Sequence, residues 1–459
     1  MLVNLTCWGG AGTVTGANFL LEIGPSQEFG TTKKILVDCG LLQGVHGSEE
    51  ENHKDFPYDP FSIDALFVTH AHIDHIGRIP KLVHDGFKGI IYSTRETKDI
   101  AELMMMDIAK ISDSNARRDG TLPIYTNHDV EESLRLWQTI PYHEAKSFTD
   151  FSVELYDAGH ILGSAMYKFI FPSDKSMLFT GDLGNSPSPL LRDTEVVTGL
   201  AYLLMDSVYG DRNHEGTEER DRKFKEIIHR VIKEGRTLLI PVFSLERTQI
   251  VLYELNKIFN EEGVRNVPVF LDSPLSIKVT EIYEKTSAYY KDSVREEAKH
   301  DDIFKFPKLL ETVQVKDAEE INRTQGGKII LAGSGMSTGG RIVGHEAHYL
   351  PDPNATILFV GYQAAGTLGR QISEGMKTVD IHGAKINVRA EVIQIGGYSA
   401  HKDSNNLVEF VSASQDTLKK VFIAMGETAS SIFLAQRLHD ELGVEAIVPE
   451  RGKTYKLEV

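Results

Sequence analysis

The stretch Thr69-His70-Ala71-His72-Ile73-Asp74-His75-Ile76-Gly77 follows directly on the apolar run Ala65-Leu66-Phe67-Val68. An apolar run that leads into a cluster of ligand-type side chains is typical of a buried strand ending in a metal-binding loop. His70 and His72 are two residues apart, so on an extended chain their imidazoles point the same way. The loop can therefore serve one metal ion with His70 and His72 and a second with Asp74 and His75. A surface histidine cluster without metal is the alternative, which this density of ligand-type residues disfavours.

The composition indicates a multidomain globular protein. A chain of 459 residues is too long for one simple core, and its 41% hydrophobic and 25% charged residues are ordinary for such a protein. No run of the sequence is apolar enough to span a bilayer, and the first residues do not resemble a signal peptide. The only cysteines, Cys7 and Cys39, fit a reducing compartment, so we expect a cytoplasmic protein without membrane association.

The charge balance bears on possible partners. The formal net charge is −17, whereas proteins that bind nucleic acid usually present a basic surface. This balance argues mildly against nucleic acid as a partner. It leaves room for a local basic groove, because attraction of a ligand depends on where the charges lie.

Short apolar runs alternate with longer polar stretches of helical character, which predicts an α/β protein. Many of the runs are apolar throughout, as in strands that are covered on both faces. The predicted strands centre on residues 35–37, 66–68, 177–179, 203–205, 238–240, 267–271, 329–331, 357–360 and 421–423. The predicted helices span residues 99–111, 218–234, 244–259 and 429–442.

Further acidic and histidine residues follow apolar runs or lie in glycine-containing turns. They are Asp38, His160, Asp182, Asp206 and His401. Taken singly, each is best explained as a turn aspartate or a surface histidine. Together with residues 70–75 they supply enough imidazole and carboxylate for two zinc ions. A carboxylate that bridges two metal ions suits metal-assisted hydrolysis of a phosphodiester.

These residues resemble the motifs of a known family. The pattern His70-x-His72-x-Asp74-His75 resembles the signature of the metallo-β-lactamase superfamily, and Asp38, His160 and Asp182 match its remaining metal-site motifs in order. The segment 206–214, Asp-Ser-Val-Tyr-Gly-Asp-Arg-Asn-His, is similar to the one that opens the β-CASP group of RNA- and DNA-processing nucleases. Residues 8–16, 241–249, 272–275, 334–341 and 361–370 match further segments of that group. The prokaryotic branch, homologous to the endonuclease subunit of pre-mRNA cleavage and polyadenylation, fits best.

The resemblance implies an architecture. A metallo-β-lactamase domain, an αββα sandwich, would be built from residues 1–208 and 395–459. An α/β β-CASP domain would be inserted at residues 209–394. Homodimers are common in this family, so a homodimer is possible.

The resemblance also implies roles around two zinc ions. His70, His72 and His160 would hold one ion, Asp74 and His75 the other, and Asp182 would bridge them. Asp38 would accept a hydrogen bond from a ligand histidine and fix its tautomer. His401 would protonate the leaving oxygen, and Asp206 would orient the His401 ring. Asp38, Asp74, Asp206 and His401 are therefore the expected catalytic residues.

Five further residues are expected to contact the nucleic-acid backbone. Ser334, Thr367 and Ser399 lie in or beside glycine-rich segments whose backbone N–H groups suit phosphate. Arg341 and Arg370 offer forked donors to the same groups. Turn geometry for the glycines and a solvated ion pair for each arginine explain these positions equally well.

The chain departs from the family pattern at Met425. The family usually carries a histidine here, in a strand-end segment followed by Gly-Glu, whereas this chain reads Ala424-Met425-Gly426-Glu427. A thioether is a soft, neutral donor that suits copper(I) better than zinc. We therefore expect Met425 not to replace the imidazole and the second zinc site to be weakened.

Three hypotheses for the function follow. The first is a zinc-dependent, endonucleolytic ribonuclease that hydrolyses single-stranded RNA through a metal-activated hydroxide. The second, motivated by Met425, is a catalytically silent homologue that binds RNA or forms complexes. The third is hydrolysis of a small ester or phosphodiester, which the number of matched β-CASP segments makes the weakest.

Overall fold

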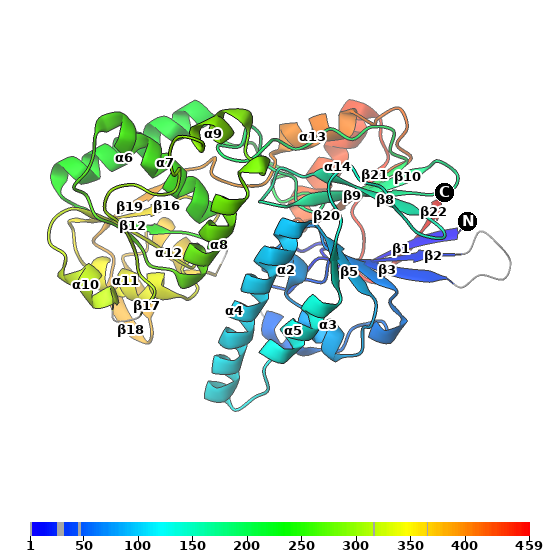
Figure 1. Cartoon of the computed structure of the whole chain (residues 1–459), viewed down its shortest axis with the longest axis horizontal. Coiled ribbons are helices and arrows are strands. Elements are labelled where there is room, and N and C mark those ends of the chain that lie inside the picture. Colours follow the sequence, from blue (N-terminus) through cyan, green and yellow to red (C-terminus); the bar gives the residue numbers. More distant parts are fainter. Residues whose placement is uncertain (1, 25–31, 45–46, 315–316, 365) are drawn as a thin grey trace. The chain divides into compact units, whose positions relative to one another are not determined.

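The computed structural model describes residues 2–24, 32–44, 47–314, 317–364 and 366–459. The chain forms two compact units, each described by itself (Figure 1). Unit 1 comprises Met1–Asn213 and Ala400–Val459, and unit 2 comprises His214–Ser399. Both boundaries lie a few residues beyond those expected after residues 208 and 394.

Unit 1 contains two seven-stranded sheets. The first has the order β22 (Thr454–Glu458), β1 (Leu2–Gly9), β2 (Asn18–Ile23), β3 (Lys33–Val37), β4 (Ala65–Phe67), β5 (Ile90–Ser93) and β6 (Trp137–Thr139). The second has the order β21 (Ala446–Ile447), β20 (Lys420–Ala424), β11 (Tyr202–Asp206), β10 (Ser176–Phe179), β9 (Ala165–Ile170), β8 (Ser152–Asp157) and β7 (Lys146–Ser147). The segment after residue 400 thus adds strands to both sheets.

The two sheets of unit 1 bury a common aromatic core. Phe19 and Phe67 come from the first sheet, and Phe169, Phe179 and Phe422 from the second. The rings of Phe67 and Phe169 meet edge to face with centroids 5.3 Å apart, a favoured arrangement of aromatic pairs. Contacts of this kind bury the inner faces of both sheets, so unit 1 is a sheet-on-sheet sandwich.

Helices cover the outer faces of this sandwich. On the second sheet, α13 (Ser404–Ser412) and α14 (Thr428–Leu442) pack Leu407 and Leu434 into one cluster with Leu203 of β11. Figure 1 shows α2 (Ile73–Ile76), α3 (Ile79–His84), α4 (Arg95–Asp119) and α5 (Asn127–Arg135) beside the first sheet. The same part of the chain also contains α1 (Ser48–His53) and the 3₁₀ turn η1 (Pro60–Ser62). The expected αββα sandwich is confirmed.

Unit 2 is an α/β domain around a parallel sheet of the order β14 (Leu309–Glu311), β13 (Val269–Leu271), β15 (Lys328–Ala332), β12 (Thr237–Pro241), β16 (Ala355–Phe359) and β19 (Glu391–Gln394). A hairpin of β17 (Thr378–Ile381) and β18 (Ala384–Asn387) accompanies it. The helices are α6 (Thr217–Glu234), α7 (Arg247–Glu262), α8 (Pro274–Lys285), α9 (Asp292–Glu297), α10 (Asp317–Arg323), α11 (Arg341–Tyr349) and α12 (Leu368–Ser373), with the 3₁₀ turn η2 (Ser287–Tyr289). Every strand and helix predicted from the apolar runs is present. No helix in the described ranges has the length and hydropathy needed to cross a membrane.

The topology of unit 1 gathers the ends of several strands. β3 and β4 run parallel in the first sheet, and β10, β11 and β20 run parallel in the second. Because parallel neighbours end at the same edge of a sheet, the residues that follow them are brought together. Those residues include Asp38 after β3, His70 and His72 after β4, Asp182 after β10, Asp206 at the end of β11 and Met425 after β20.

Candidate metal centre

The loop after β4 presents four ligand-type side chains from an extended segment and one helical turn. His70 and His72 lie in the extended segment, and Asp74 and His75 belong to α2. The amide of His75 donates to the carbonyl of His72 over 2.9 Å, which starts the turn at His72. The change from extended chain to helix at His72 brings the side chains of His70 and His72 and those of Asp74 and His75 to one place.

Three imidazoles and a carboxylate converge on this loop. His72 Nδ1 lies 3.1 Å from His70 Nε2 and 3.1 Å from His160 Nε2. Asp182 Oδ2 lies 3.5 Å from each of the same two Nε2 atoms. The donor atoms of all four residues lie within 4.8 Å of one another. This donor set is one that zinc prefers.

The protonation of these histidines also fits a metal ligand. Burial is the largest influence on His72 and His160, and it holds the pKa of both imidazoles well below the usual value. The pKa of His70 is lowered for the same reason. A metal binds the neutral imidazole, so the ligand-competent form is the one present near pH 7.

Asp74 and His75 form a second set of donors that shares Asp182. His75 Nε2 lies 3.4 Å from Asp182 Oδ1 and 3.9 Å from Asp74 Oδ2. His75 Nε2 and Asp182 Oδ1 are both buried and have no hydrogen-bond partner among the described residues. Buried polar atoms are almost always hydrogen-bonded, so two that share only a 3.4 Å ion-pair contact fit a pair of metal ligands. Asp182 thus offers one oxygen to each set.

Asp38 fixes the orientation of His75 from behind. Asp38 has a left-handed backbone conformation, with φ of 60°, and is fully buried. Its carboxylate accepts from the Thr69 amide and the Thr69 hydroxyl, each over 2.8 Å, and lies 2.8 Å from His75 Nδ1. Because the hydrogen bond occupies Nδ1, His75 Nε2 is left to face the donor cluster.

Met425 packs in the core of unit 1. It follows β20 with a left-handed φ of 46°, is 2% exposed and belongs to the core between the sheets. Its sulfur packs against Gly10, where a Cβ would lie only 2.5 Å from Sδ. The amide of Met425 donates to the carbonyl of Gly10 over 2.7 Å, which holds the two segments together. Met425 therefore has a packing role in this structure.

His401 and Asp206 lie beside the donor sets. His401 Nδ1 is 3.7 Å from Asp206 Oδ2 and 3.9 Å from Asp182 Oδ2, and its side chain is 22% exposed. Asp206 Oδ1 accepts from the Leu183 amide over 3.0 Å, which fixes the carboxylate. Burial alone would lower the pKa of His401, but the carboxylates of Asp206 and Asp182 outweigh it and raise the pKa.

The five residues expected to contact the nucleic-acid backbone belong to unit 2. Ser334 Oγ accepts from the Thr338 amide over 3.0 Å, and Thr367 caps α12 by accepting from the Arg370 amide over 3.2 Å. Arg341 donates to the buried carboxylate of Asp272 over 2.5 Å. Arg370 donates to Glu374 over 2.6 Å. Ser399 is the last residue of unit 2. Contact of these residues with nucleic acid stays a prediction.

Two groups that support the centre were not singled out from the sequence. The Thr69 hydroxyl lies 3.0 Å from His70 Nδ1 and donates a hydrogen bond to the carboxylate of Asp38. His160 Nδ1 lies 3.1 Å from the carbonyl of Ala400, more than two hundred residues away in the chain. Thr69 is adjacent to the histidine loop and could have been included on that ground. No sequence signal marks a backbone carbonyl as a partner.

Comparisons with known proteins were made for the whole chain. Residues 27–223 match the family described as the metallo-beta-lactamase superfamily, and residues 248–372 match the Beta-Casp domain. Residues 385–449 match a Zn-dependent metallo-hydrolase RNA specificity domain. These three matches follow one another along the chain.

Similar proteins include one named a ribonuclease and one named a transcription termination factor. The chain is 33% identical to Ribonuclease TTHA0252 of Thermus thermophilus over 432 residues, which cover 94% of this chain and 95% of that protein. It is 31% identical to Transcription termination factor FttA of Pyrococcus horikoshii, covering 97% of this chain and 71% of that protein. A crystal structure of a protein of unknown function from Enterococcus faecalis V583 superposes with a TM-score of 0.57 at 14% identity, covering both chains in full. That likeness bears on the fold alone.

Proposed function

Because this chain belongs to the metallo-β-lactamase superfamily and, within it, to the β-CASP family of metal-dependent RNA-processing nucleases, we propose that it is a zinc-dependent ribonuclease acting on single-stranded RNA. The observation that carries the proposal is the convergence of His70, His72, His160 and Asp182 within 4.8 Å. The neighbouring pair His401 and Asp206 adds a proton donor to these ligands. Ligands and an acid side by side suit hydrolysis of a phosphodiester.

We assign the residues to two ions. His70, His72 and His160 would hold the first, Asp74 and His75 the second, and Asp182 would bind both. When bound, divalent ions supply a hydroxide nucleophile near neutral pH and neutralise charge on the phosphate. Asp38 keeps the His75 ring in the orientation that presents Nε2.

The remaining proton transfer is assigned to His401. Its Nδ1 faces the carboxylates of Asp206 and Asp182, and Nε2 would be the nitrogen that meets a substrate. A protonated His401 would donate this proton to the oxygen that leaves when the phosphodiester breaks. Asp206 holds the ring and stabilises the charged imidazolium.

We further propose that cleavage is endonucleolytic and confined to unpaired strands. The test uses one labelled RNA in linear, circular and fully base-paired forms, incubated with the zinc-loaded protein. We expect cleavage of the linear and circular forms and little cleavage of the duplex. Cleavage of the circle requires an internal cut, because a circle has no end from which an exonuclease could start. His72→Ala should abolish cleavage of both the linear and the circular RNA.

Other outcomes of this test separate the alternatives. A folded, zinc-containing protein that leaves every RNA intact would favour the catalytically silent homologue. Turnover of a small phosphodiester without turnover of RNA would favour a small-molecule hydrolase. A homodimer and a cytoplasmic location stay predictions from the sequence.

Replacing Met425 by histidine should increase occupancy of the second metal site. Asp74, His75 and Asp182 supply that site with three donors, and Met425 stands where the family supplies another. The left-handed backbone at residue 425 is one that histidine adopts more readily than most residues. We expect the zinc content measured by mass spectrometry to rise from about one toward two per chain.

Met425→Leu is the matched control, because it conserves volume and removes only the thioether. Its zinc content should equal that of the wild-type protein, since the sulfur packs against Gly10. Two fully occupied zinc sites in the wild-type protein would contradict the weakened second site. A loss of zinc in Met425→Leu would show that the thioether is a ligand.

A further inference from the structure

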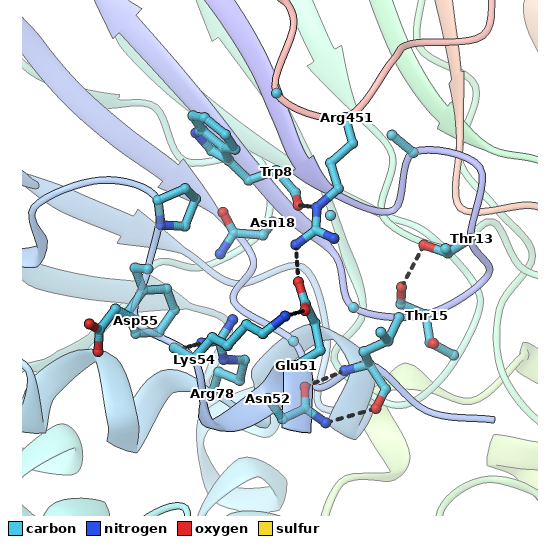
Figure 2. Close-up of a pocket in the computed structure, with 18 residues that line it drawn as sticks. Trp8, Thr13, Thr15, Asn18, Glu51, Asn52, Lys54, Asp55, Arg78 and Arg451 are labelled. Carbon is cyan, nitrogen blue, oxygen red and sulfur yellow. Dashed lines mark hydrogen bonds and ion pairs between the residues drawn. The ribbon is translucent and has the colours of Figure 1, made fainter. Parts of the chain in front are cut away.

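A cavity of about 480 Å³ opens in unit 1 (Figure 2). It lies next to residues 69–77, the loop after β4 that carries the predicted metal ligands and is called the metal loop below. Ala17 links this loop to the wall of the cavity: its amide donates to the Asp74 carbonyl over 2.8 Å, and its carbonyl accepts from the amide of Gly40, a wall residue, over 2.9 Å. Gly40 approaches Asp74 so closely that a Cβ would lie 1.5 Å from the Asp74 carbonyl oxygen. The volume falls in the range of small-ligand pockets.

The cavity gathers cations in a chain that is acidic as a whole. Lys54, Arg78 and Arg451 line it, against the carboxylates of Glu51 and Asp55, although the chain carries a net charge of −17. Figure 2 shows Glu51 between two of these cations: Lys54 Nζ lies at 2.7 Å and Arg451 Nη2 at 2.5 Å. Hydrogen bonds from Lys54 and Arg451 lower the pKa of Glu51 to about 2. Glu51 is therefore anionic and holds both cations at one point of the wall.

An aromatic ring forms another part of the wall. Trp8 is partly buried, and Arg451 Nε donates to its carbonyl over 3.0 Å. Gly452, with φ of 78°, closes on the indole, where a Cβ would lie 3.1 Å from the ring. The turn between β21 and β22 therefore packs Gly452 against the indole and holds the Arg451 guanidinium at the backbone carbonyl of Trp8. This pairing of an aromatic surface with a cation is how proteins bind unpaired nucleotides.

Three buried polar atoms around the cavity have no hydrogen-bond partner among the described residues. They are Trp8 Nε1, Asn18 Oδ1 and Arg78 Nε. Asn18 is only 7% exposed, and its Nδ2 donates a hydrogen bond to the Tyr58 hydroxyl over 2.8 Å. Buried polar groups are nearly always paired, so Trp8, Asn18 and Arg78 give the wall unused hydrogen-bonding capacity.

We propose that this cavity is a nucleotide subsite of the nuclease, in which a base of single-stranded RNA stacks on Trp8 and its phosphate binds Arg451 and Lys54. The inference rests on the proposed function and adds the place where the strand is held beside the metal loop. Asn18 and Arg78 provide an acceptor and a donor for the polar edge of the base or for the ribose. Only an unpaired base can stack on the indole, so the subsite also explains a preference for single strands.

The first test measures binding without cleavage. Single-stranded RNA is added to the metal-free protein, and tryptophan fluorescence is followed. Stacking on Trp8 should quench the emission of the wild-type protein, and Trp8→Phe should lose this quenching. Adenosine monophosphate should compete, whereas inorganic phosphate at equal concentration should not. Unchanged quenching in Trp8→Phe, or competition by phosphate alone, would overturn the proposal.

The second test compares RNA with a minimal substrate, bis(p-nitrophenyl) phosphate. Trp8→Ala should lower the ratio of kcat/KM for RNA to that for the small diester about 5- to 100-fold, the effect of one lost base stack. Arg451→Gln should reduce the slope of log affinity against log salt by about 0.7, the loss of one phosphate contact. Arg118→Gln, an exposed arginine on α4, is the matched control and should change neither quantity.

The two levels of the proposal fail differently. If the wild-type protein cleaves no RNA, the proposed function is wrong. If it cleaves RNA, but Trp8→Ala and Arg451→Gln leave the ratio and the salt slope unchanged, the subsite is wrong while the nuclease stands. Zinc content and the unfolding temperature of each variant show whether it is folded.

Discussion

Replacing Asp182 by asparagine should lower kcat/KM for RNA cleavage by about 10³-fold or more, because metal ions contribute several kcal/mol and each 1.36 kcal/mol is a factor of ten. The carboxylate of Asp182 reaches both donor sets, with Oδ2 3.5 Å from His70 and His160 and Oδ1 3.4 Å from His75. Asparagine keeps the shape of the side chain and removes the negative charge that two cations need. We therefore expect zinc content to fall together with the rate.

The measurement pairs steady-state cleavage of a labelled RNA with zinc per chain. Asp174→Asn is the matched control: Asp174 lies on an exposed turn with φ of 61°, a conformation that asparagine also adopts. Its rate and zinc content should equal those of the wild-type protein. An Asp182→Asn variant that keeps its zinc and cleaves within tenfold of the wild type would contradict the shared role of this carboxylate.

Much of the metal centre could be predicted because its residues follow apolar runs. A buried parallel strand is apolar throughout, so its end is visible in the sequence, and a polar residue at that end has a defined place. Asp38, Asp182 and Asp206 are each recognisable in this way, and the sheet order brings their strand ends together. The αββα sandwich followed from the resemblance rather than from these runs alone.

The partners within the centre could not be predicted in the same way. The sequence indicates that Asp38 supports a histidine, whereas only the structure shows that this histidine is His75. Similarly, Arg341 has the character of a phosphate-binding residue in its glycine-rich segment. In the structure it donates to the buried carboxylate of Asp272, an equally good use of a forked donor.

The cavity beside the metal loop is the clearest case of information that lies outside the sequence pattern. Arg451 and Glu51 are four hundred residues apart in the chain and form one ion pair. Trp8 lies in a segment that matched the family, yet its neighbours Lys54 and Arg78 belong to no recognisable motif. Such a site depends on long-range pairing of strands, which local spacing does not determine.

The second large effect is expected at His401, where alanine should reduce cleavage of RNA by about 10²- to 10⁴-fold, the usual contribution of a general acid. The leaving group of RNA is an alkoxide, which needs a proton as the bond breaks. p-Nitrophenolate leaves without one. We therefore expect His401→Ala to retain much more of its activity on bis(p-nitrophenyl) phosphate than on RNA. His128→Ala, at an exposed histidine of α5, should leave both substrates unaffected.

The pH profile distinguishes an acid from a residue that only shapes the site. His401 must be protonated to act, and the carboxylates of Asp206 and Asp182 raise its pKa against the opposing effect of burial. Activity should therefore be present below this pKa and fall as the pH rises through it. Asp206→Asn removes one of the charges that raise the pKa, so the fall should move to lower pH. The same variant leaves the nearest metal-ligand histidines in place, and zinc content should be retained. If His401→Ala slowed both substrates equally and Asp206→Asn left the profile unmoved, His401 would be a structural residue and another group would supply the proton.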